Sequence, residues 1–171
     1  MRQSNRGGVI ARSGEAFWRF SLTLYARPGV AEALIRLQDR AGRDVNLTLF
    51  ALWAGAVRGV RLDARALRQA EAAIDGLRAG IVEPLRGLRR HLKADPDPDF
   101  RDLRRRVLRL ELAAERQVQQ RLASSLSLPS AETNRLAAAE ANLALYVGAE
   151  AQSPEATLIR EALAALARYG H

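Results

Sequence analysis

Nine basic side chains gather within residues 86–109, where guanidinium and ammonium groups at this density could bind phosphate or carboxylate. Only four acidic residues accompany them in the same stretch. Several of the cations recur at intervals of three and four residues, which places them on one face of a helix. A solvated face that only improves solubility is the competing interpretation. The candidate residues for binding an acidic partner or a phosphate are Arg86, Arg89, Arg90, Lys93, Arg101, Arg104, Arg105 and Arg109.

A second group of side chains could line a small-molecule pocket in the N-terminal third of the chain. Six of the nine aromatic residues lie between Phe17 and Trp53. Indole and phenol groups can form an apolar pocket wall while their polar atoms orient a ligand. Plain packing of rings in the core is the alternative. The residues of this candidate pocket are Trp18, Tyr25, Asp44, Asn46 and Trp53.

Other reactive groups give no comparable pattern. The chain has no Cys, which excludes disulfides and thiolate metal sites. Its two histidines, His91 and His171, have no Ser or carboxylate at a spacing that suggests a catalytic triad. The sequence therefore predicts no catalytic residue and no cofactor, and it favours a protein that is not an enzyme.

One cluster of oxygen-bearing side chains around residues 38–46 raises the question of a metal site. Carboxylate and amide oxygens are ligands for hard cations. The segment lacks the dense acidic loop of such sites, and helix caps and turns account for residues of these types. We therefore predict no metal there. The four residues are Gln38, Asp39, Asp44 and Asn46.

The size and composition of the chain are those of one water-soluble domain. It has 171 residues, 48% of them apolar, and a formal net charge of +8. The basic excess belongs to residues 1–94, which carry 17 Lys and Arg against 8 Asp and Glu. No window approaches the roughly 18 consecutive apolar residues of a membrane span, and no secretory signal is visible. We expect a cytoplasmic protein.

Apolar residues recur at helical spacing along almost the whole chain, which predicts an all-α fold of about seven helices. Ser13 can cap the first helix, and Pro28 ends it. Gly42 is a stop signal for the second helix, and Asp44 can cap a third that runs to about Val57. That third segment is apolar nearly all round, so it should be buried at the centre. It also alternates like a strand, but its neighbours favour a helix.

The middle of the chain predicts a long antiparallel helical hairpin. Asp63 caps a fourth helix with an apolar seam, and Pro84 should kink or break it near residues 80–83. The run at 95–99, Asp-Pro-Asp-Pro-Asp, cannot continue a helix and forms a turn. A fifth helix then covers about 99–126. Because the link is short, the two helices should be antiparallel neighbours.

Two further helices complete the expected fold. Ser130 and Thr133 are rival caps for a sixth helix through Val147, and Ser153-Pro154 opens a seventh. The expected organisation is a flexible tail at 1–12 and a single domain at 13–171, divided into an aromatic-rich unit (13–57), the long hairpin (63–126) and the C-terminal helices (130–169).

Several ordered blocks of sequence go beyond helical periodicity. The first comprises Phe-Trp-x-Phe-Ser-Leu-x-Leu-Tyr at 17–25, Pro-Gly-Val-Ala at 28–31, Leu-Gln-Asp at 37–39, Gly-x-Asp-Val-Asn-Leu at 42–47 and Leu-Phe-x-x-Trp at 49–53. Ile-Val-Glu-Pro-Leu-Arg-x-Leu-Arg-Arg-x-Leu-Lys at 81–93 and Glu-Leu-x-Ala-Glu at 111–115 are the second and third. Together they resemble the uncharacterised proteobacterial family called domain of unknown function 2390. The resemblance implies a small bacterial cytosolic protein and supplies no catalytic residue.

These observations lead to three functional hypotheses. The first is a non-enzymatic interaction protein whose Arg-rich hairpin tip engages an acidic protein partner or another copy of the chain. The second is a nucleic-acid-binding protein that uses the same cations, although no aromatic residue interleaves them for base stacking. The third is a small-ligand or enzymatic pocket among the N-terminal aromatic residues.

Overall fold

The computed structural model describes residues 3–94, 97, 100–125 and 134–169, with side chains from residue 13 onward, and it is helical throughout with no strand among these residues. This confirms the predicted all-α class. If the interrupted helix at 64–94 is taken as one, the described residues form seven helices, as predicted. The elements are α1 (Gln3–Tyr25), α2 (Val30–Ala41), α3 (Val45–Ala56), α4 (Ala64–Leu77), a π-helical segment (Arg78–Val82), α5 (Glu83–Ala94), α6 (Phe100–Ser125), α7 (Arg135–Val147), a 3-10 segment (Gly148–Gln152) and α8 (Pro154–Tyr169).

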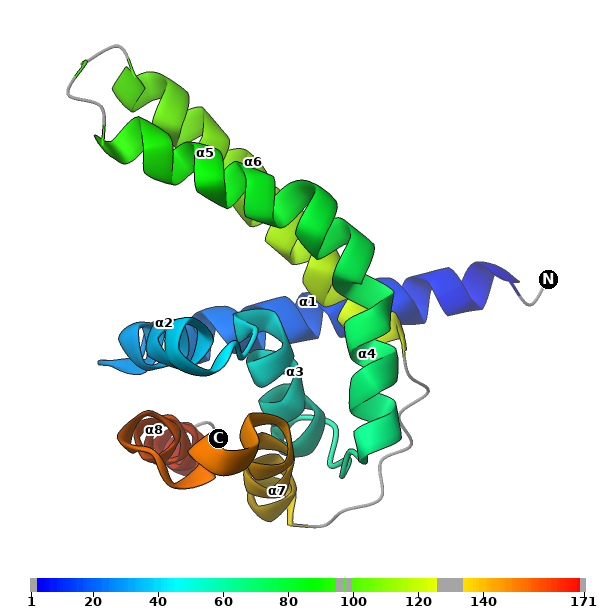
Figure 1. Ribbon diagram of the computed structural model, residues 1–171. Coiled ribbons are helices and arrows are strands. Elements are labelled where there is room, and N and C mark those ends of the chain that lie inside the picture. Colours follow the sequence, from blue (N-terminus) through cyan, green and yellow to red (C-terminus); the bar gives the residue numbers. More distant parts are fainter. Residues whose placement is uncertain (1–2, 95–96, 98–99, 126–133, 170–171) are drawn as a thin grey trace.

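Helix α3 is the centre of the body, and ten of its twelve residues are buried. It packs against α7, α6, α1 and α2 (Figure 1). Phe17 of α1 stacks on Trp53 of α3, with ring centroids 5.1 Å apart, and meets Phe50 edge-on at 6.0 Å. Burial of each such ring stabilises the fold by about 1.5–3 kcal/mol. The expectation of a central, buried third helix is confirmed.

Most of the predicted caps form. The Asp44 carboxylate accepts a hydrogen bond from the Leu47 amide at 3.0 Å, and Asp63 accepts one from the Ala66 amide at 2.7 Å. Ser153 likewise caps α8. Each cap satisfies one of the amide donors that the first turn of a helix leaves unpaired.

Two predicted helix starts differ in the structure. Helix α1 begins at Gln3, so Ser13 lies inside it rather than at its cap, and residues 3–12 are helical where the sequence predicts a tail. The segment contains no proline, and each of its glycines costs only about 1 kcal/mol in a helix. Helix α7 is capped by Asn134. The predicted caps Ser130 and Thr133 lie outside the described residues.

Pro84 interrupts the long helix where the sequence predicts, but the helix does not stop. In a regular α-helix the proline ring would clash with the carbonyl of Gly80, four residues earlier. The preceding turn instead widens into the π-helical segment, in which the Glu83 amide donates to the Arg78 carbonyl five residues back. The chain then continues directly into α5, so α4 and α5 form one long, interrupted rod (Figure 1).

Helices α5 and α6 form the predicted antiparallel hairpin, which projects beyond the rest of the molecule (Figure 1). Most of the predicted turn at 95–99 lies outside the described residues. The C-terminal half of α6 returns to the body and packs on α1. No helix in the described part of the chain is both long and apolar enough to cross a lipid bilayer.

Candidate functional site

A buried carboxylate joins the two helices of the hairpin at its base. Glu111 of α6 is only 4% exposed, and it accepts hydrogen bonds from two arginines of α5. Arg86 Nε lies 3.5 Å from Glu111 Oε1, and Arg89 donates through Nε to one carboxylate oxygen and through Nη2, at 3.2 Å, to the other. The hydrogen bond to Glu111 raises the pKa of Arg89 above its ordinary value. Both arginines are therefore structural members of the hairpin as well as surface cations.

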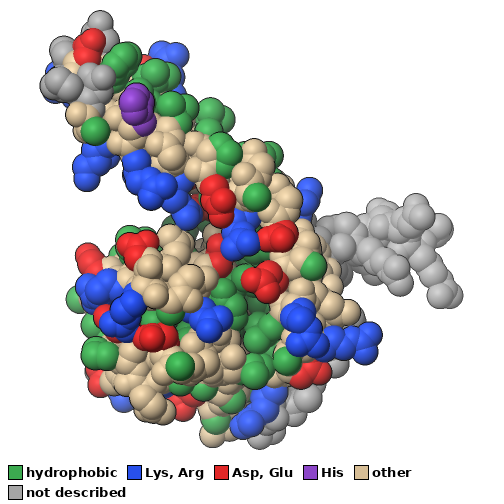
Figure 2. Space-filling view, in the orientation of Figure 1, with side chains coloured by type: hydrophobic (Ala, Val, Ile, Leu, Met, Phe, Trp, Pro, Cys, Tyr) green, Lys and Arg blue, Asp and Glu red, His purple; other side chains and the backbone are tan. Residues whose placement is uncertain are grey.

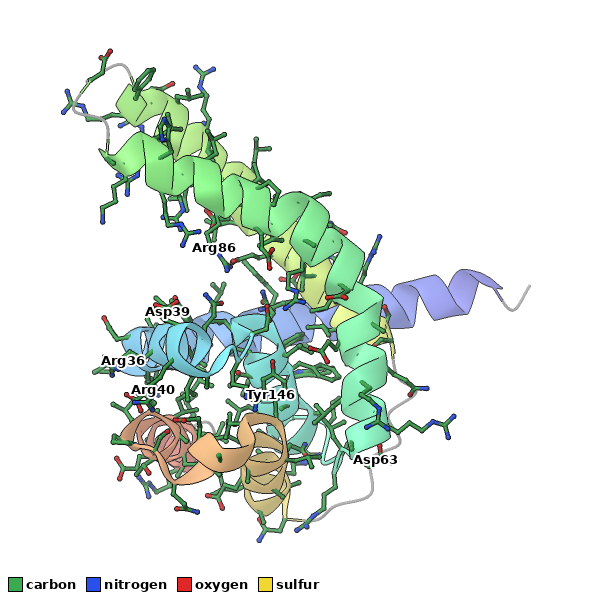
Figure 3. The ribbon with its side chains drawn as sticks, viewed as in Figure 1. Arg36, Asp39, Arg40, Asp63, Arg86 and Tyr146 are labelled. Carbon is green, nitrogen blue, oxygen red and sulfur yellow. The ribbon has the colours of Figure 1, made fainter. Side chains whose placement is uncertain are left out.

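Arg86 also connects the hairpin to the body. Its Nη2 lies 2.8 Å from Glu115 Oε1 on α6, and its Nη1 donates to the side-chain carbonyl of Gln38 on α2 at 3.4 Å. Figure 3 shows Arg86 pointing from α5 into the angle between the hairpin and α2. Burial raises the pKa of Glu115, and the hydrogen bond from Arg86 opposes this shift. One guanidinium thus links three helices, α5, α6 and α2, by hydrogen bonds.

Of the remaining sequence-predicted cations, Arg105 is paired within α6, together with the neighbouring Arg106. Arg105 lies 3.1 Å from Asp102, and Arg106 lies 2.8 Å from the other oxygen of the same carboxylate. All three side chains are exposed, so this local pairing is weak. Arg101 also has an interaction partner. Within residues 86–109, the cations with no hydrogen bond or ion pair among the described residues are Arg90, Lys93, Arg104 and Arg109.

The sequence-predicted cluster therefore has two kinds of member in the described structure: cations that bind carboxylates of α6 and cations that are exposed to solvent. Arg86, Arg90 and Lys93 follow one another at i, i+4 and i+7 along α5, so they share one side of the helix, which we call the α5 basic face. Figure 2 shows Lys and Arg side chains along the edge of the hairpin that is turned toward the body. Arg90 and Lys93 are exposed, so their charges are available on this face.

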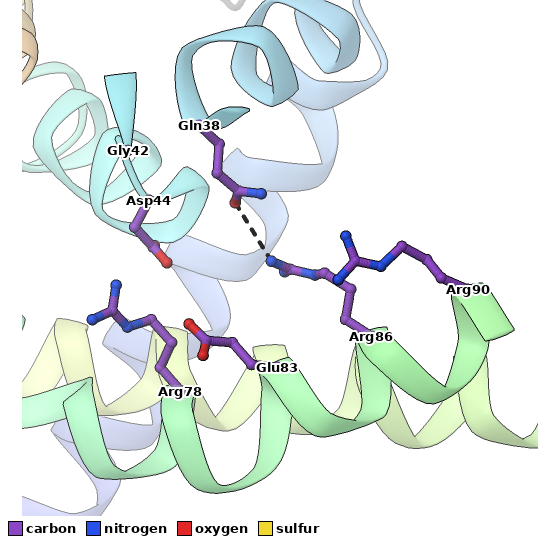
Figure 4. A pocket seen from close by; sticks show the side chains of 7 residues that line it. All are labelled: Gln38, Gly42, Asp44, Arg78, Glu83, Arg86 and Arg90. Atoms are coloured by element: carbon purple, nitrogen blue, oxygen red, sulfur yellow. Dashed lines mark hydrogen bonds between the residues drawn. The ribbon is translucent and has the colours of Figure 1, made fainter. Parts of the chain in front are cut away.

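A polar pocket of about 330 Å³ lies where the hairpin meets the body. The turn between α2 and α3 forms one wall, and the π-helical segment with α5 forms the other (Figure 4). We call it the junction pocket. The Arg78 Nη2 atom lies 2.6 Å from Asp75, whereas the Arg78 Nε atom is buried and has no hydrogen-bond acceptor. Its lining residues are Gln38, Gly42, Asp44, Arg78, Glu83, Arg86 and Arg90.

The structure does not bring the five predicted pocket residues together. Trp53 is fully buried in the ring cluster, and Asn46 is 7% exposed and hydrogen-bonded to Gln119 in the core. Trp18 lines a separate surface groove between α1 and α6, while 39% of Tyr25 is exposed. Only Asp44 lines the junction pocket. The packing of rings, which the sequence leaves as the alternative, accounts for Trp53.

The oxygen-bearing side chains near the α2–α3 turn have separate roles. Asp44 caps α3, Gln38 accepts from Arg86, and Asn46 accepts from Gln119. Asp39 is exposed on α2. No group of three His, Asp or Glu side chains within the described part of the chain is arranged to hold a metal ion.

Three residues of the junction pocket are missing from the sequence-based candidates, namely Arg78, Glu83 and Gly42. Their local sequence shows only helix-forming and helix-ending residues. The signal that could have located the pocket is Pro84, because the wide turn next to it lies directly beneath the end of α2 (Figure 4). Sequence spacing could not show which surface would face that turn.

Comparison with known proteins gives one match. A family model described as a protein of unknown function, DUF2390, matches residues 16–122. No curated protein and no solved structure matches the chain. The matched region contains the α5 basic face, both walls of the junction pocket and Glu111, and it ends before α7. The features described above therefore lie within the part of the chain that the family shares.

Proposed function

This chain belongs to the DUF2390 family, and we propose that it is a non-enzymatic adaptor that binds an acidic segment of a partner protein through the α5 basic face. The supporting observation is that Arg90 and Lys93 lie on a projecting hairpin without a carboxylate partner among the described residues. Guanidinium groups offer a planar pair of donors that matches a carboxylate. A partner's Asp or Glu side chains would supply the missing acceptors.

The base of the hairpin supports the same proposal. Glu111 holds Arg86 and Arg89, and Arg86 reaches Gln38 on the body, so the α5 basic face is held at a fixed angle. The helix that carries Arg90 and Lys93 is therefore already in place, so on this side binding orders only their two side chains. The cost of binding then falls mainly on the partner segment, which favours an extended or flexible acidic ligand.

An acidic protein segment suits this surface better than a nucleic acid does. Glu83 and Asp44 line the pocket at the proximal end of the α5 basic face, and they would repel a continuous phosphate backbone. No aromatic side chain accompanies Arg86, Arg90 and Lys93 on the face, so stacking on bases has no platform. A short acidic peptide needs only the exposed cations.

Fluorescence anisotropy with a labelled oligoglutamate peptide tests the proposal at low and physiological salt. The double variant Arg90→Glu, Lys93→Glu should weaken binding by at least about tenfold, because two attractive contacts become repulsive. The matched control is Arg65→Glu, Arg68→Glu on α4. It changes the same charge at the same three-residue spacing, and both arginines are exposed without a described partner. The control should weaken binding far less.

Equal weakening by both double variants would reduce the interaction to net charge and contradict the proposal. Labelled single-stranded DNA of equal charge serves as a competitor. If the DNA binds more tightly than the peptide and loses affinity with Arg90→Glu, Lys93→Glu, nucleic acid is the partner instead. If the unvaried chain shows concentration-dependent mass in light scattering that the same variant abolishes, the acidic partner is a second copy.

A further inference from the structure

The junction pocket contains charged groups whose hydrogen-bonding atoms are not all paired within the described structure. Arg90 and Glu83 line it without any hydrogen bond or ion pair among the described residues. Asp44 uses Oδ1 to cap α3. Glu83, the second carboxylate oxygen of Asp44 and Arg90 are therefore available to a ligand.

The charges in the pocket are separated along its length. Figure 4 shows Asp44, Arg78 and Glu83 at one end and Arg90 at the other, with the hydrogen bond from Arg86 to Gln38 between them. Arg78 bonds to Asp75 and interacts electrostatically with Asp44 and Glu83, whereas Arg86 is balanced by Glu111 and Glu115. One cation therefore faces three carboxylates at one end of the pocket, which leaves an excess of negative charge there, and Arg90 has no ion-pair partner among the described residues at the other end.

The two ends are too far apart for a single ion. Glu83 and Arg90 are seven residues apart on α5, which corresponds to about 10 Å of helical rise. Flexible side chains shorten that span, but one phosphate at Arg90 would still leave the excess negative charge at the other end of the pocket unbalanced. A pocket of about 330 Å³ lies at the lower end of the usual range for ligand sites, about 300–1,000 Å³. Its occupant must therefore be small and must carry both signs of charge.

We propose that the junction pocket binds a small bipolar molecule, with an ammonium or guanidinium group at Asp44 and Glu83 and a carboxylate several bonds away at Arg90. An ω-amino or guanidino acid has this chemistry. This site goes beyond the proposed adaptor function, because it depends on the two carboxylates rather than on the outer part of the α5 basic face.

NMR titration of the full chain with 5-aminopentanoate tests the proposal. Pentylamine and pentanoate are matched probes that carry one charge each on a similar chain, and inorganic phosphate probes a simple anion site. The bipolar probe should shift the amide resonances of the α2–α3 turn and α5 with saturation. It should bind at least about tenfold more tightly than either single-charge probe, as expected for one added charge-assisted hydrogen bond.

Substitutions of single pocket residues show which side chains contribute to binding of 5-aminopentanoate. Glu83→Gln and Arg90→Gln should each weaken binding of 5-aminopentanoate by about tenfold. The controls Glu161→Gln and Arg65→Gln, at exposed positions outside the pocket, should leave binding unchanged. Equal affinity for the bipolar and single-charge probes, no saturable shift at all, or binding of phosphate alone would overturn the proposal. A thermal unfolding curve for each variant confirms that it is folded.

Two single variants, Glu83→Gln and Lys93→Glu, separate this site from the adaptor function. Glu83→Gln should abolish the preference for the bipolar probe without weakening the oligoglutamate peptide. Lys93→Glu should weaken the peptide and leave 5-aminopentanoate binding intact, because Lys93 does not line the pocket. If both substitutions affect both ligands alike, the two sites are not distinct and the bipolar site is rejected.

Discussion

At the scale of single residues, the buried carboxylate of Glu111 makes a testable contribution to the stability of the fold. Glu111→Gln removes the charge that holds Arg86 and Arg89, which are both partly buried, with about a fifth to a quarter of each side chain exposed. Loss of one partner of a buried pair leaves unpaired charge, and solvent reduces the cost here to about 2 kcal/mol. Urea unfolding measures it.

A matched control for Glu111 lies on the same helix. Asp102 also accepts from two arginines, but all three groups are exposed. Asp102→Asn should leave the unfolding free energy almost unchanged, because water replaces the lost ion pairs. If the two substitutions destabilise the protein equally, burial is not what gives the Glu111 cluster its importance.

We predict that the contribution of Tyr146 to the stability of the fold decreases at high pH. Its hydroxyl accepts a hydrogen bond from the Asp44 amide at 2.9 Å, and burial raises the pKa of Tyr146 to about 12. The folded state keeps the phenol protonated, whereas the unfolded chain ionises it near its ordinary pKa of about 10. The stability that Tyr146 confers is therefore complete below about pH 10 and declines as the pH rises toward 12. Urea unfolding of the unvaried chain and Tyr146→Phe should give converging free energies over that range.

Among these side-chain contacts, the sequence predicts the helix caps but not the ion pairs between helices. The caps at Asp44, Asp63 and Ser153 were predictable because donor and acceptor lie three residues apart. The pairing of Arg86 with Glu111 was not, because it depends on the register between two helices. Helical spacing shows which cations share a face, but it does not show whether a carboxylate of the neighbouring helix lies opposite.

At the scale of elements, we predict that replacing glycine with alanine has opposite effects on stability at two positions. A Cβ added to Gly55 of α3 would lie 2.2 Å from the Ala139 amide nitrogen of α7. Neither backbone can move aside without separating the two helices, so Gly55→Ala should cost about 3 kcal/mol or more. A Cβ on Gly87 of α5 would have no atom within 4 Å. Gly87→Ala should stabilise the fold by about 0.5–1 kcal/mol.

Thermal unfolding of both glycine variants, followed by circular dichroism, gives the two signs in one experiment. A destabilised Gly87→Ala would mean that the exposed side of α5 is packed against something in solution. A neutral Gly55→Ala would contradict the close approach of α3 to α7. The sequence identifies both residues only as glycines inside helices. Their opposite roles depend on the distance to the neighbouring helix, which helical periodicity does not encode.

Helix boundaries can likewise be predicted from the sequence only where their cause is local. Pro84 fixes the position of the interruption in the long helix because its clash with the preceding turn is local. The helix absorbs that clash by a π-helical turn at Arg78–Val82, and α6 contacts the chain on both sides of the break. Proline alone does not specify whether a helix widens, kinks or stops. The start of α1 at Gln3 rather than Ser13 has a different cause. Ser13 has the right residue type for a cap, but nothing before it stops a helix.

At the scale of the molecule, the sequence predicts the core of the body but not the direction in which the hairpin projects. The density of rings in residues 17–53 correctly predicts the centre of the core, since Phe17, Phe50 and Trp53 are fully buried. The projection of α5 and α6 away from that core was not predictable. It depends on the packing of α6 against α1, α3 and α4, and on the hydrogen bonds from Arg86 to Glu115 and Gln38. The junction pocket is a consequence of that arrangement.

The C-terminal helix joins the body through a buried carboxylate, and this contact predicts the behaviour of the whole fold in acid. Glu155, 7% exposed at the start of α8, binds Arg36 at 3.1 Å and Arg40 at 3.0 Å, both on α2. A hydrogen bond from its own amide, followed by the contacts with Arg36 and Arg40, lowers the pKa of Glu155 below its ordinary value. The stability that it contributes is therefore present above the unfolded-state pKa and is lost as the pH falls through the lower folded-state pKa.

Glu155→Gln should accordingly lower the urea midpoint of the whole domain at pH 7, and the difference from the unvaried chain should shrink in acid. The exposed Glu161→Gln, on the same helix, is the matched control and should have little effect at either pH. Unfolding monitored by both tryptophan fluorescence and circular dichroism shows whether α8 separates before the core. A difference that persists unchanged at low pH would mean that the glutamate acts through packing, because the ion pairs to α2 require its charge.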